Sequence, residues 1–329
     1  MTKTNQQKVK DFLINNGVII VMFILVIYTG FTSDNFFTKN NFMNILMNMS
    51  SRLVIALGIA GCVITAGCDL SAGRMIGFGA CISGMLLQRM DYSGKFFPDM
   101  QPLNVFVVAL IAMLVCAAFG TVTGFFIAYL NVPPFIATLA MMEIVYGIGL
   151  IVTNATPLGG YVEQYTNVSN GKFLGINYLI WIAIIVAVIT WFIFNMTRHG
   201  KYMYAIGGNP QAAEVAGVPV KLTLILIYMK AAAMYGLAGF MLGAKSGGAS
   251  VQLGYGYEME AIAACTIGGV SVTGGRGKVS SAFVGVAVFE LLKIALQYMG
   301  VNANAQYIAI GIVIFVAISL DIRKYVAKK

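Results

Sequence analysis

Four ionisable residues lie inside long apolar runs of this sequence, where a charged side chain is costly. Glu143 lies in the run PPFIATLAMMEIVYG, and Lys230 lies about two helical turns into another apolar run. Glu290 and Lys293 are three residues apart in a third run, a spacing that favours their mutual neutralisation on one helix face. A charge at the centre of a bilayer costs roughly 2.5–3.5 kcal/mol, so each of these residues is expected to have a charged partner or a functional role. Glu143 and Lys230 either partner each other across a helical bundle or face a transport pathway.

Two glycine-rich stretches resemble each other, and each lies between two apolar runs. They read GCDLSAGR (67–74) and GVSVTGGR (269–276). Paired breaks in the two halves of a membrane chain indicate discontinuous helices at a transport site. Chance convergence of glycine-rich turns is the alternative, and an inverted repeat would make one of the span boundaries given below wrong. The polar side chains that the two stretches would bring to a solute pathway are those of Asp69, Ser71, Ser271 and Thr273.

The sequence contains no constellation that indicates catalysis or metal binding. Its one histidine, His199, lies next to Arg198 at the end of an apolar run, and its five cysteines lack the spacing of a zinc site. The nearest approach to a phosphate-binding loop is GGRGKVSS. There, Val279 follows Lys278, and Val272 occupies the position of the first glycine. The chain is therefore expected to be no enzyme, to hold no metal and to bind no ATP itself.

The elements that must position these residues are membrane-spanning helices. The 329-residue chain is 59% hydrophobic and 10% charged, with mean hydropathy +0.84, whereas soluble domains carry about 25% charged residues. Apolar runs of about 20 residues recur from end to end and leave no room for a separate soluble domain. We expect an all-α polytopic membrane protein with a single transmembrane domain over residues 1–329. About ten spans are expected, at 17–32, 45–66, 73–90, 103–129, 133–153, 177–197, 222–244, 258–272, 279–297 and 305–320.

The distribution of basic residues predicts the orientation of these spans. Most Lys and Arg residues between the spans fall on the same side as the N-terminus, so the positive-inside rule places both termini in the cytoplasm. The net charge of +9 then reflects topology rather than nucleic-acid binding. The first span has no small-residue cleavage site before Thr32 and is expected to be an uncleaved signal anchor. Arg52 is counted among the residues of the outside segments.

A polar segment at 198–221, on the cytoplasmic side in this topology, contains a short capped helix. Asn209 can cap it, Pro210 suits its first position, and Gly217 with Pro219 supplies a stop, which predicts a helix at 210–216. Such a short helix is marginal in water, so it is expected to dock on another surface. Its alanine-rich face is too small for the apolar anchor that a headgroup-bound helix requires, which favours a protein groove over lipid.

Five stretches spread along the chain carry a resemblance to a known family. They read ALGIAGCVITAGCDLSAGRMIGFGA, GFFIAYLNVPPFIATLAMMEIVYG, YAIGGNPQAAEVAGVPV, YEMEAIAACTIGGVSVTGGRGKV and GVNANAQYIAIGIVIFVAISLD. Together they resemble, nearly end to end, the membrane permease subunits of ribose/galactose-type ATP-binding cassette (ABC) sugar importers. The likeness is greatest to the galactose/methyl-galactoside branch. One reason is TAGCDLSAGR, because ribose permeases tend towards GGIDLSVG.

The resemblance implies a homodimer around a central pathway in the bacterial cytoplasmic (inner) membrane. It also implies a cytoplasmic ATPase, usually one polypeptide with two nucleotide-binding domains, which binds ATP and Mg²⁺, and an extracytoplasmic sugar-binding protein. Glu143 and Lys230 lie where the family more often has apolar or small residues, so the resemblance assigns them no role. The family's ATPase-coupling segment corresponds here to Asn209, Pro210, Gln211, Ala212, Ala213, Glu214, Val215, Ala216 and Gly217.

The leading hypothesis is ATP-driven import of a monosaccharide, galactose or a methyl galactoside, with the helix at 210–216 docked on the ATPase. The sugar would pass as a weakly held neutral solute near the four polar residues of the glycine-rich stretches. One alternative is a secondary transporter energised by an ion gradient through Glu143 and Lys230. Others are an ABC permease for ribose, another pentose or a nucleoside, and a membrane scaffold or multipass enzyme. The missing catalytic clusters count against the enzyme.

Overall fold

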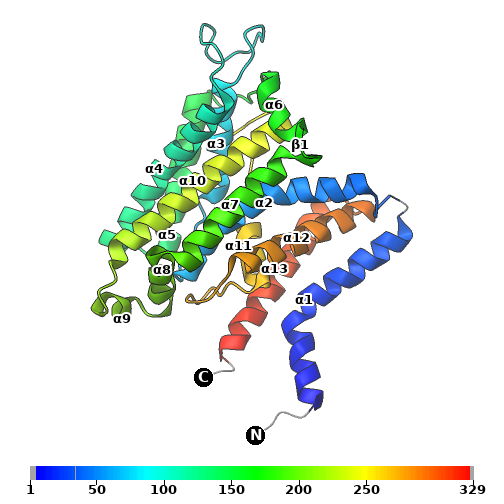
Figure 1. The fold of residues 1–329 in the computed structure, drawn as a ribbon, viewed down its shortest axis with the longest axis vertical. Coiled ribbons are helices and arrows are strands. Elements are labelled where there is room, and N and C mark those ends of the chain that lie inside the picture. Colours follow the sequence, from blue (N-terminus) through cyan, green and yellow to red (C-terminus); the bar gives the residue numbers. More distant parts are fainter. Residues whose placement is uncertain (1–4, 34, 327–329) are drawn as a thin grey trace.

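The computed structural model describes residues 5–33 and 35–326, which form a bundle of helices with one small hairpin (Figure 1). The hairpin and α6 lie at one end of the long central helices, hereafter the α6 end. The helices α8 and α9 lie at the other end, hereafter the α9 end (Figure 1). The helices are α1 (Asn5–Thr32), α2 (Lys39–Ile64), α3 (Ala72–Leu86), α4 (Val105–Tyr129), α5 (Pro134–Thr153), α6 (Glu163–Asn170), α7 (Tyr178–Met196), α8 (Arg198–Gly208), α9 (Pro210–Val215), α10 (Val220–Ser246), α11 (Tyr257–Gly268), α12 (Val279–Tyr298) and α13 (Ala303–Val326), and the strands are β1 (Lys172–Phe173) and β2 (Ile176–Asn177).

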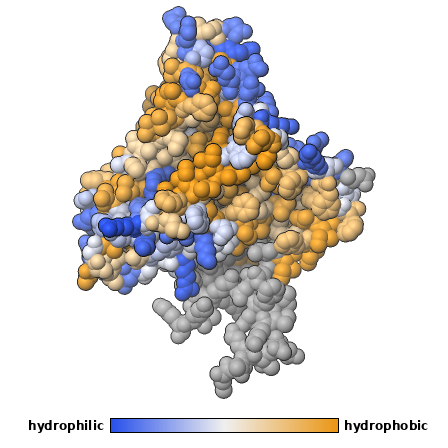
Figure 2. Space-filling model, in the orientation of Figure 1, coloured by the Kyte–Doolittle hydropathy of each residue, from blue (hydrophilic) through white to orange (hydrophobic). Residues whose placement is uncertain are grey.

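Six of the described helices are long and apolar enough to cross a membrane. They are α2, α4, α5, α7, α10 and α12, and three shorter apolar stretches lie in α1, α3 and α13. Large apolar side chains on α4 and α7 are exposed, as expected of surfaces that face lipid. Figure 2 shows a broad hydrophobic surface over the middle of the molecule and hydrophilic residues at its top. The prediction of a helical membrane protein is thus confirmed. The number of ten spans and the cytoplasmic position of both termini stay predictions.

The centre of the bundle is α10, which packs against α2, α3 and α4. Small residues allow this close approach, as is usual between membrane helices. A methyl group on Gly239 of α10 would collide with the backbone of Ile76 in α3, and one on Gly236 would collide with the backbone of Ala112 in α4. The three helices therefore meet backbone to backbone.

Two non-helical segments run into the bundle, at 65–71 between α2 and α3 and at 247–256 between α10 and α11. The second lies along α3, because Gly77 leaves room for the backbone of Val251 and Leu253. As a result α3 and α11 have only 15 and 12 residues, roughly 22 and 18 Å, too short for a bilayer core of about 30 Å. Both glycine-rich stretches lie between two helices, as predicted: residues 67–71 precede α3, and residues 269–276 form the turn between α11 and α12. Their relation as an inverted repeat stays a prediction, and the break at 247–256 lies outside both stretches.

Candidate functional site

The predicted short helix is present as α9 and is capped at its N-terminus. The side chain of Asn209 accepts a hydrogen bond from the backbone nitrogen of Ala212 at 3.0 Å, and Pro210 occupies the first turn. The first backbone N–H groups of a helix have no partner within the helix. Here the Asn209 side chain accepts from one of them, and Pro210 has no N–H group to satisfy. The helix ends at Val215 with Ala216 as its cap, one residue before the predicted end.

The C-terminus of α9 ends in a Schellman motif. The backbone nitrogens of Gly217 and Val218 donate to the carbonyls of Glu214 and Ala213 at 2.9 and 3.0 Å. Gly217 has φ +83°, the left-handed conformation that this motif requires. Of the α9 residues only Ala213 is buried, and Val215 is 91% exposed. The helix is thus fixed at both ends by its own chain, and most of its surface is exposed.

The eleven residues before α9 were predicted to be loop but form the helix α8. Its start is capped by the Thr197 hydroxyl, which accepts from the backbone nitrogen of Gly200 at 3.2 Å. Met203 and Ile206 are buried on one face. Their three-residue spacing is the sequence signal that would have revealed the helix, because it places both side chains on the same side.

A contact at the α9 end joins α8 to the membrane bundle. The hydroxyl of Tyr204 donates to the carbonyl of Gly277 at 2.8 Å, and the nitrogen of Gly275 donates to the carbonyl of Ile64 at 2.8 Å. A Cβ on Gly207 would collide with the backbone of Ile64. The glycine-rich turn at 269–276, together with Gly277 directly after it, therefore ties α8 to the end of α2.

The four pathway residues predicted from the glycine-rich stretches form two local pairs. The hydroxyl and the backbone nitrogen of Ser71 both donate to Asp69 Oδ1, at 2.5 and 3.0 Å. The hydroxyls of Ser271 and Thr273 are 2.9 Å apart. Asp69 and Ser71 are 1% and 0% exposed, so in this conformation they offer no open surface to a solute. Their place in the pathway stays a prediction.

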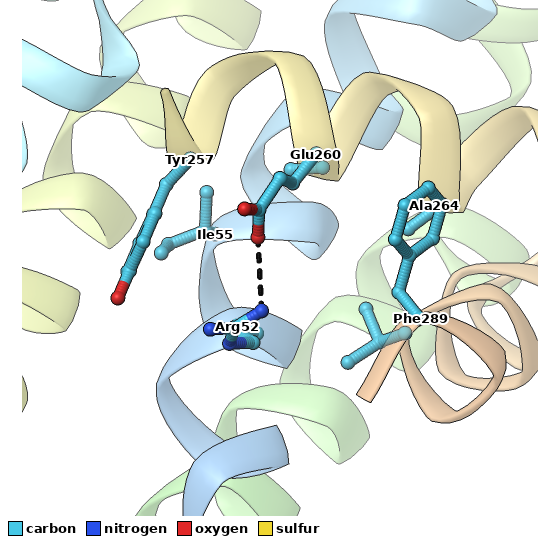
Figure 3. A pocket seen from close by; sticks show the side chains of 8 residues that line it. Arg52, Ile55, Tyr257, Glu260, Ala264 and Phe289 are labelled. Carbon is cyan, nitrogen blue, oxygen red and sulfur yellow. Dashed lines mark hydrogen bonds and ion pairs between the residues drawn. The ribbon is translucent and has the colours of Figure 1, made fainter. Parts of the chain in front are cut away.

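Near the middle of α2, four charged side chains from three helices form a cluster. Figure 3 shows two of them, Arg52 and Glu260, and the ion pair between them. Arg52 Nη1 lies 2.9 Å from Glu260 Oε2 of α11, and Arg52 Nε lies 3.1 Å from Glu290 Oε2 of α12. Lys293 Nζ of α12 lies 2.5 Å from Glu260 Oε1. The cluster holds two positive and two negative groups, each at most 20% exposed. The charges balance, as buried ionisable groups require.

This cluster corrects two predictions. Glu290 pairs with Arg52 rather than with Lys293, because α2 brings a guanidinium to it and α11 brings a carboxylate to Lys293. Arg52 does not belong to an outside segment, because it lies near the middle of α2, inside the span predicted at 45–66, and pairs there with two carboxylates.

A cavity of about 450 Å³ lies beside the charged cluster. Its lining combines aromatic rings with amide, charged and aliphatic groups. The lining residues include Tyr255, Tyr257, Glu260, Lys293, Gln306 and Tyr307.

Glu143 and Lys230 do not pair with each other in the described part of the chain. Glu143 lies exposed near the middle of α5. Lys230 of α10 borders a small cavity beside Phe194 and Met203. The ion pairs among the described residues include neither side chain. The predicted ion pair between Glu143 and Lys230 is therefore absent from the described residues, and the alternative, that either side chain faces a pathway, stays a prediction.

His199, at the start of α8, is half-buried, and its Nε2 atom is buried without a hydrogen-bond partner among the residues that the structure describes. Burial of the ring, and then the positive charge of Lys230, lower the pKa of His199 from 6.5 to about 4. The unfolded chain would therefore take up this proton first as the pH falls. The contribution of neutral His199 to the free energy of unfolding should be fully present above about pH 6.5 and should be lost progressively as the pH falls towards 4.

We expect His199→Gln to reduce this acid sensitivity. The loss of stability in the parent at pH 5 should be at most about 2 kcal/mol, less after solvent screening of the half-buried ring. The measurement is the thermal unfolding midpoint of the detergent-purified protein at pH 7 and pH 5, in the parent and the variant. Equal decreases in both proteins would show that His199 does not cause the effect.

Comparison with known proteins extends over the whole chain. Residues 41–318 match the family described as branched-chain amino acid transport system / permease component. The chain is 40% identical to the galactose/methyl galactoside import permease protein MglC of Escherichia coli strain K12 and 41% identical to MglC of Haemophilus influenzae, with 100% of each chain covered. It is 31% identical to the ribose import permease protein RbsC of E. coli K12, over 96% of both chains. No solved structure matches the chain.

The family match fits what the structure shows, namely apolar helices long enough to cross a membrane and broken helices beside them. It covers most of the chain, from the third residue of α2 into α13. The chain is a multi-pass membrane protein and belongs to the family of branched-chain amino acid transport system permease components.

Proposed function

We propose that this chain is the membrane-spanning permease of an ABC importer that carries a monosaccharide, galactose or a methyl galactoside, into the cytoplasm. The observation that carries the proposal is full-length identity of 40% to permeases named for galactose and methyl galactoside import. The ribose permease is less similar, at 31%. The broad family is described by branched-chain amino acids, but these sugar permeases are more specific guides to the solute.

The proposed entry point of energy is α9. A six-residue helix is too short to be stable alone, yet this one is capped at both ends and exposes Glu214 and Val215. These features suit a rigid insert in a groove of an ATPase. The contacts of α8 with Gly277, and of the 269–276 turn with Ile64, would carry its movement to α2 and α12.

The assembled importer would contain partners that this chain does not supply. We infer two copies of the permease, a cytoplasmic ATPase that binds ATP and Mg²⁺, and an extracytoplasmic sugar-binding protein. The permease itself has no role in ATP hydrolysis in this scheme. The complex would lie in the cytoplasmic membrane of a bacterium.

The second candidate is an ion-coupled secondary transporter. The observation that favours it is the pair of lone intramembrane charges, Glu143 and Lys230, which lack ion-pair partners among the described residues. Two observations weigh against it. The chain is similar over its full length to import permeases, and the two charges come from different helices, α5 and α10, and form no ion pair with each other among the described residues.

Reconstitution separates the two candidates. The permease, its ATPase and its binding protein are placed in liposomes, and uptake of radiolabelled galactose is followed with ATP enclosed. We expect uptake that requires ATP, the ATPase and the binding protein, and that persists when an ionophore collapses all ion gradients. Uptake that stops with the ionophore but continues without the ATPase would overturn the ABC assignment.

A further inference from the structure

An arginine lies between two tyrosine rings near the middle of the bundle, outside the charged cluster around Arg52. The guanidinium carbon of Arg74 is 4.0 Å from the ring centre of Tyr146 and 4.6 Å from that of Tyr255. Arg74 Nη1 donates to Gln252 Oε1 at 2.6 Å, and Gln252 Nε2 donates to the Tyr146 hydroxyl at 2.8 Å. Three separate elements, α3, α5 and the segment 247–256, thus meet in one polar cluster.

The cluster lies at mid-depth of the membrane helices. Tyr146 is near the middle of α5, and Arg74 is in the first turn of α3, which begins inside the bundle. The segment 247–256 is non-helical there because Gly254 and Gly256 have φ +92° and +84°. Non-helical backbone at membrane depth occurs where it is buried in protein or lines a water-filled cavity.

The exposed side of this cluster does not suit contact with lipid. Gln252 is exposed, and Tyr255 is 64% exposed. Glu143 precedes Tyr146 by three residues, so it lies on the same face of α5, and it is also exposed. Ionisable groups at this depth face a bundle interior or water rather than lipid tails. The central pathway between two copies of the permease, which is part of the proposed function, would account for this face.

We propose that Arg74, Tyr146, Gln252 and Tyr255 form a contact site for a neutral hexose on its way through the membrane. The proposal rests on the proposed function and names the site that the transported sugar would touch. It is separate from the four residues of the glycine-rich stretches, three of which, Asp69, Ser71 and Ser271, are buried.

The chemistry of the site fits a sugar. The exposed ring of Tyr255 can stack on the C–H face of a pyranose, and the amide of Gln252 can both donate to and accept from hydroxyls. Arg74 has five N–H donors. Among the described residues it donates one hydrogen bond, to Gln252, so other donors are left for the sugar. Arg74 in the cluster and Glu143 on the same face of α5 carry opposite charges, so together they suit a neutral solute.

A purely structural role makes a different prediction. If Arg74 only braces the segment 247–256 against α5, loss of its partners lowers stability. If the cluster contacts the sugar, loss of the exposed groups lowers transport without lowering stability. Tyr255 and Gln252 are the best positions to test, because both are exposed and their removal opens no buried cavity.

The experiment uses the complete importer in liposomes with galactose-loaded binding protein. Tyr255→Ala and Gln252→Ala should each reduce the initial rate of galactose uptake about tenfold, as expected for the loss of one good polar or stacking contact. Tyr255→Phe keeps the ring and should stay within about twofold of the parent. ATP hydrolysis stimulated by the binding protein, and the thermal unfolding midpoint, should stay at parental values in all three variants.

Tyr129→Ala is the matched control, because Tyr129 also faces a cation, with Lys221 Nζ 5.2 Å from its ring centre, but lies at the end of α4. It should transport galactose at the parental rate. Parental uptake in Tyr255→Ala and Gln252→Ala, or a loss of uptake that follows a lowered unfolding midpoint, would overturn the sugar site. Absence of ATP-dependent uptake in the parent would instead overturn the proposed function, and the sugar site with it.

Discussion

A Gly217→Val variant is expected to lose ATP-driven sugar uptake by about 5- to 150-fold while the protein still reaches the membrane. Gly217 closes the Schellman motif at the end of α9 with φ +83°. A β-branched residue in this conformation costs about 1–3 kcal/mol. A six-residue helix has little stability with which to offset this, so its last turn should open and its fit to the ATPase should be lost.

The matched control is Gly175→Val. Gly175 has φ +78° and, like Gly217, has open space where a Cβ atom would lie, but it belongs to the β1–β2 turn at the α6 end. The backbone strain is therefore the same, and only the location differs. A second variant, Glu214→Arg, reverses a charge on exposed α9 without straining the backbone. Uptake at the parental rate in both Gly217→Val and Glu214→Arg would remove the coupling role of α9.

An Arg52→Leu variant is expected to lose about 3–5 kcal/mol of stability. The substitution leaves Glu260 and Glu290 with only Lys293 to balance them among the described side chains of the cluster, in a site where Glu290 is 3% exposed. An unpaired buried carboxylate carries its full desolvation cost. The loss is a large fraction of the 5–15 kcal/mol that typically separates folded from unfolded protein. It should appear as a lower thermal unfolding midpoint and as less protein in the membrane.

The double variant Arg52→Leu/Glu290→Leu tests the reason for that loss. It removes one charge of each sign and keeps the pair between Lys293 and Glu260, so it should be more stable than Arg52→Leu alone. Arg89→Leu serves as a control, because its pair with Asp91 is solvent-exposed and should be worth less than about 1 kcal/mol. If the double variant is no more stable than the single one, charge balance does not hold this cluster together.

Local signals in the sequence predicted local structure well. The cap at Asn209, the proline after it and the glycine at 217 act within a few residues, so α9 was predicted to within one residue. The long apolar runs likewise predicted α4, α5, α7 and α12 closely. The helix α8 was missed because its polar and glycine residues concealed two buried side chains, Met203 and Ile206.

Partners across the bundle could not be predicted in the same way. The sequence paired Glu290 with Lys293 because they are neighbours on one helix, but Arg52 comes from a helix more than 200 residues away. The cluster of Arg74 with Tyr146, Gln252 and Tyr255 was missed for the same reason. Its members are scattered through the sequence, and no spacing rule connects them. Such contacts depend on how the helices pack, which a single sequence does not state.

The position of Arg52 has a consequence for the order in which the chain matures. Arg52 and Glu260 are 208 residues apart. At synthesis rates of about 5–20 residues per second, α2 leaves the ribosome roughly 10 to 40 seconds before its first carboxylate partner exists. During that interval α2 carries an unmatched charge, and its hydropathy of 1.6 is well below the 2.7 of α4. The charge of Arg52 is neutralised only after α11 and α12 have been synthesised. In a nascent chain that ends before residue 260, Arg52 therefore has neither of its two carboxylate partners.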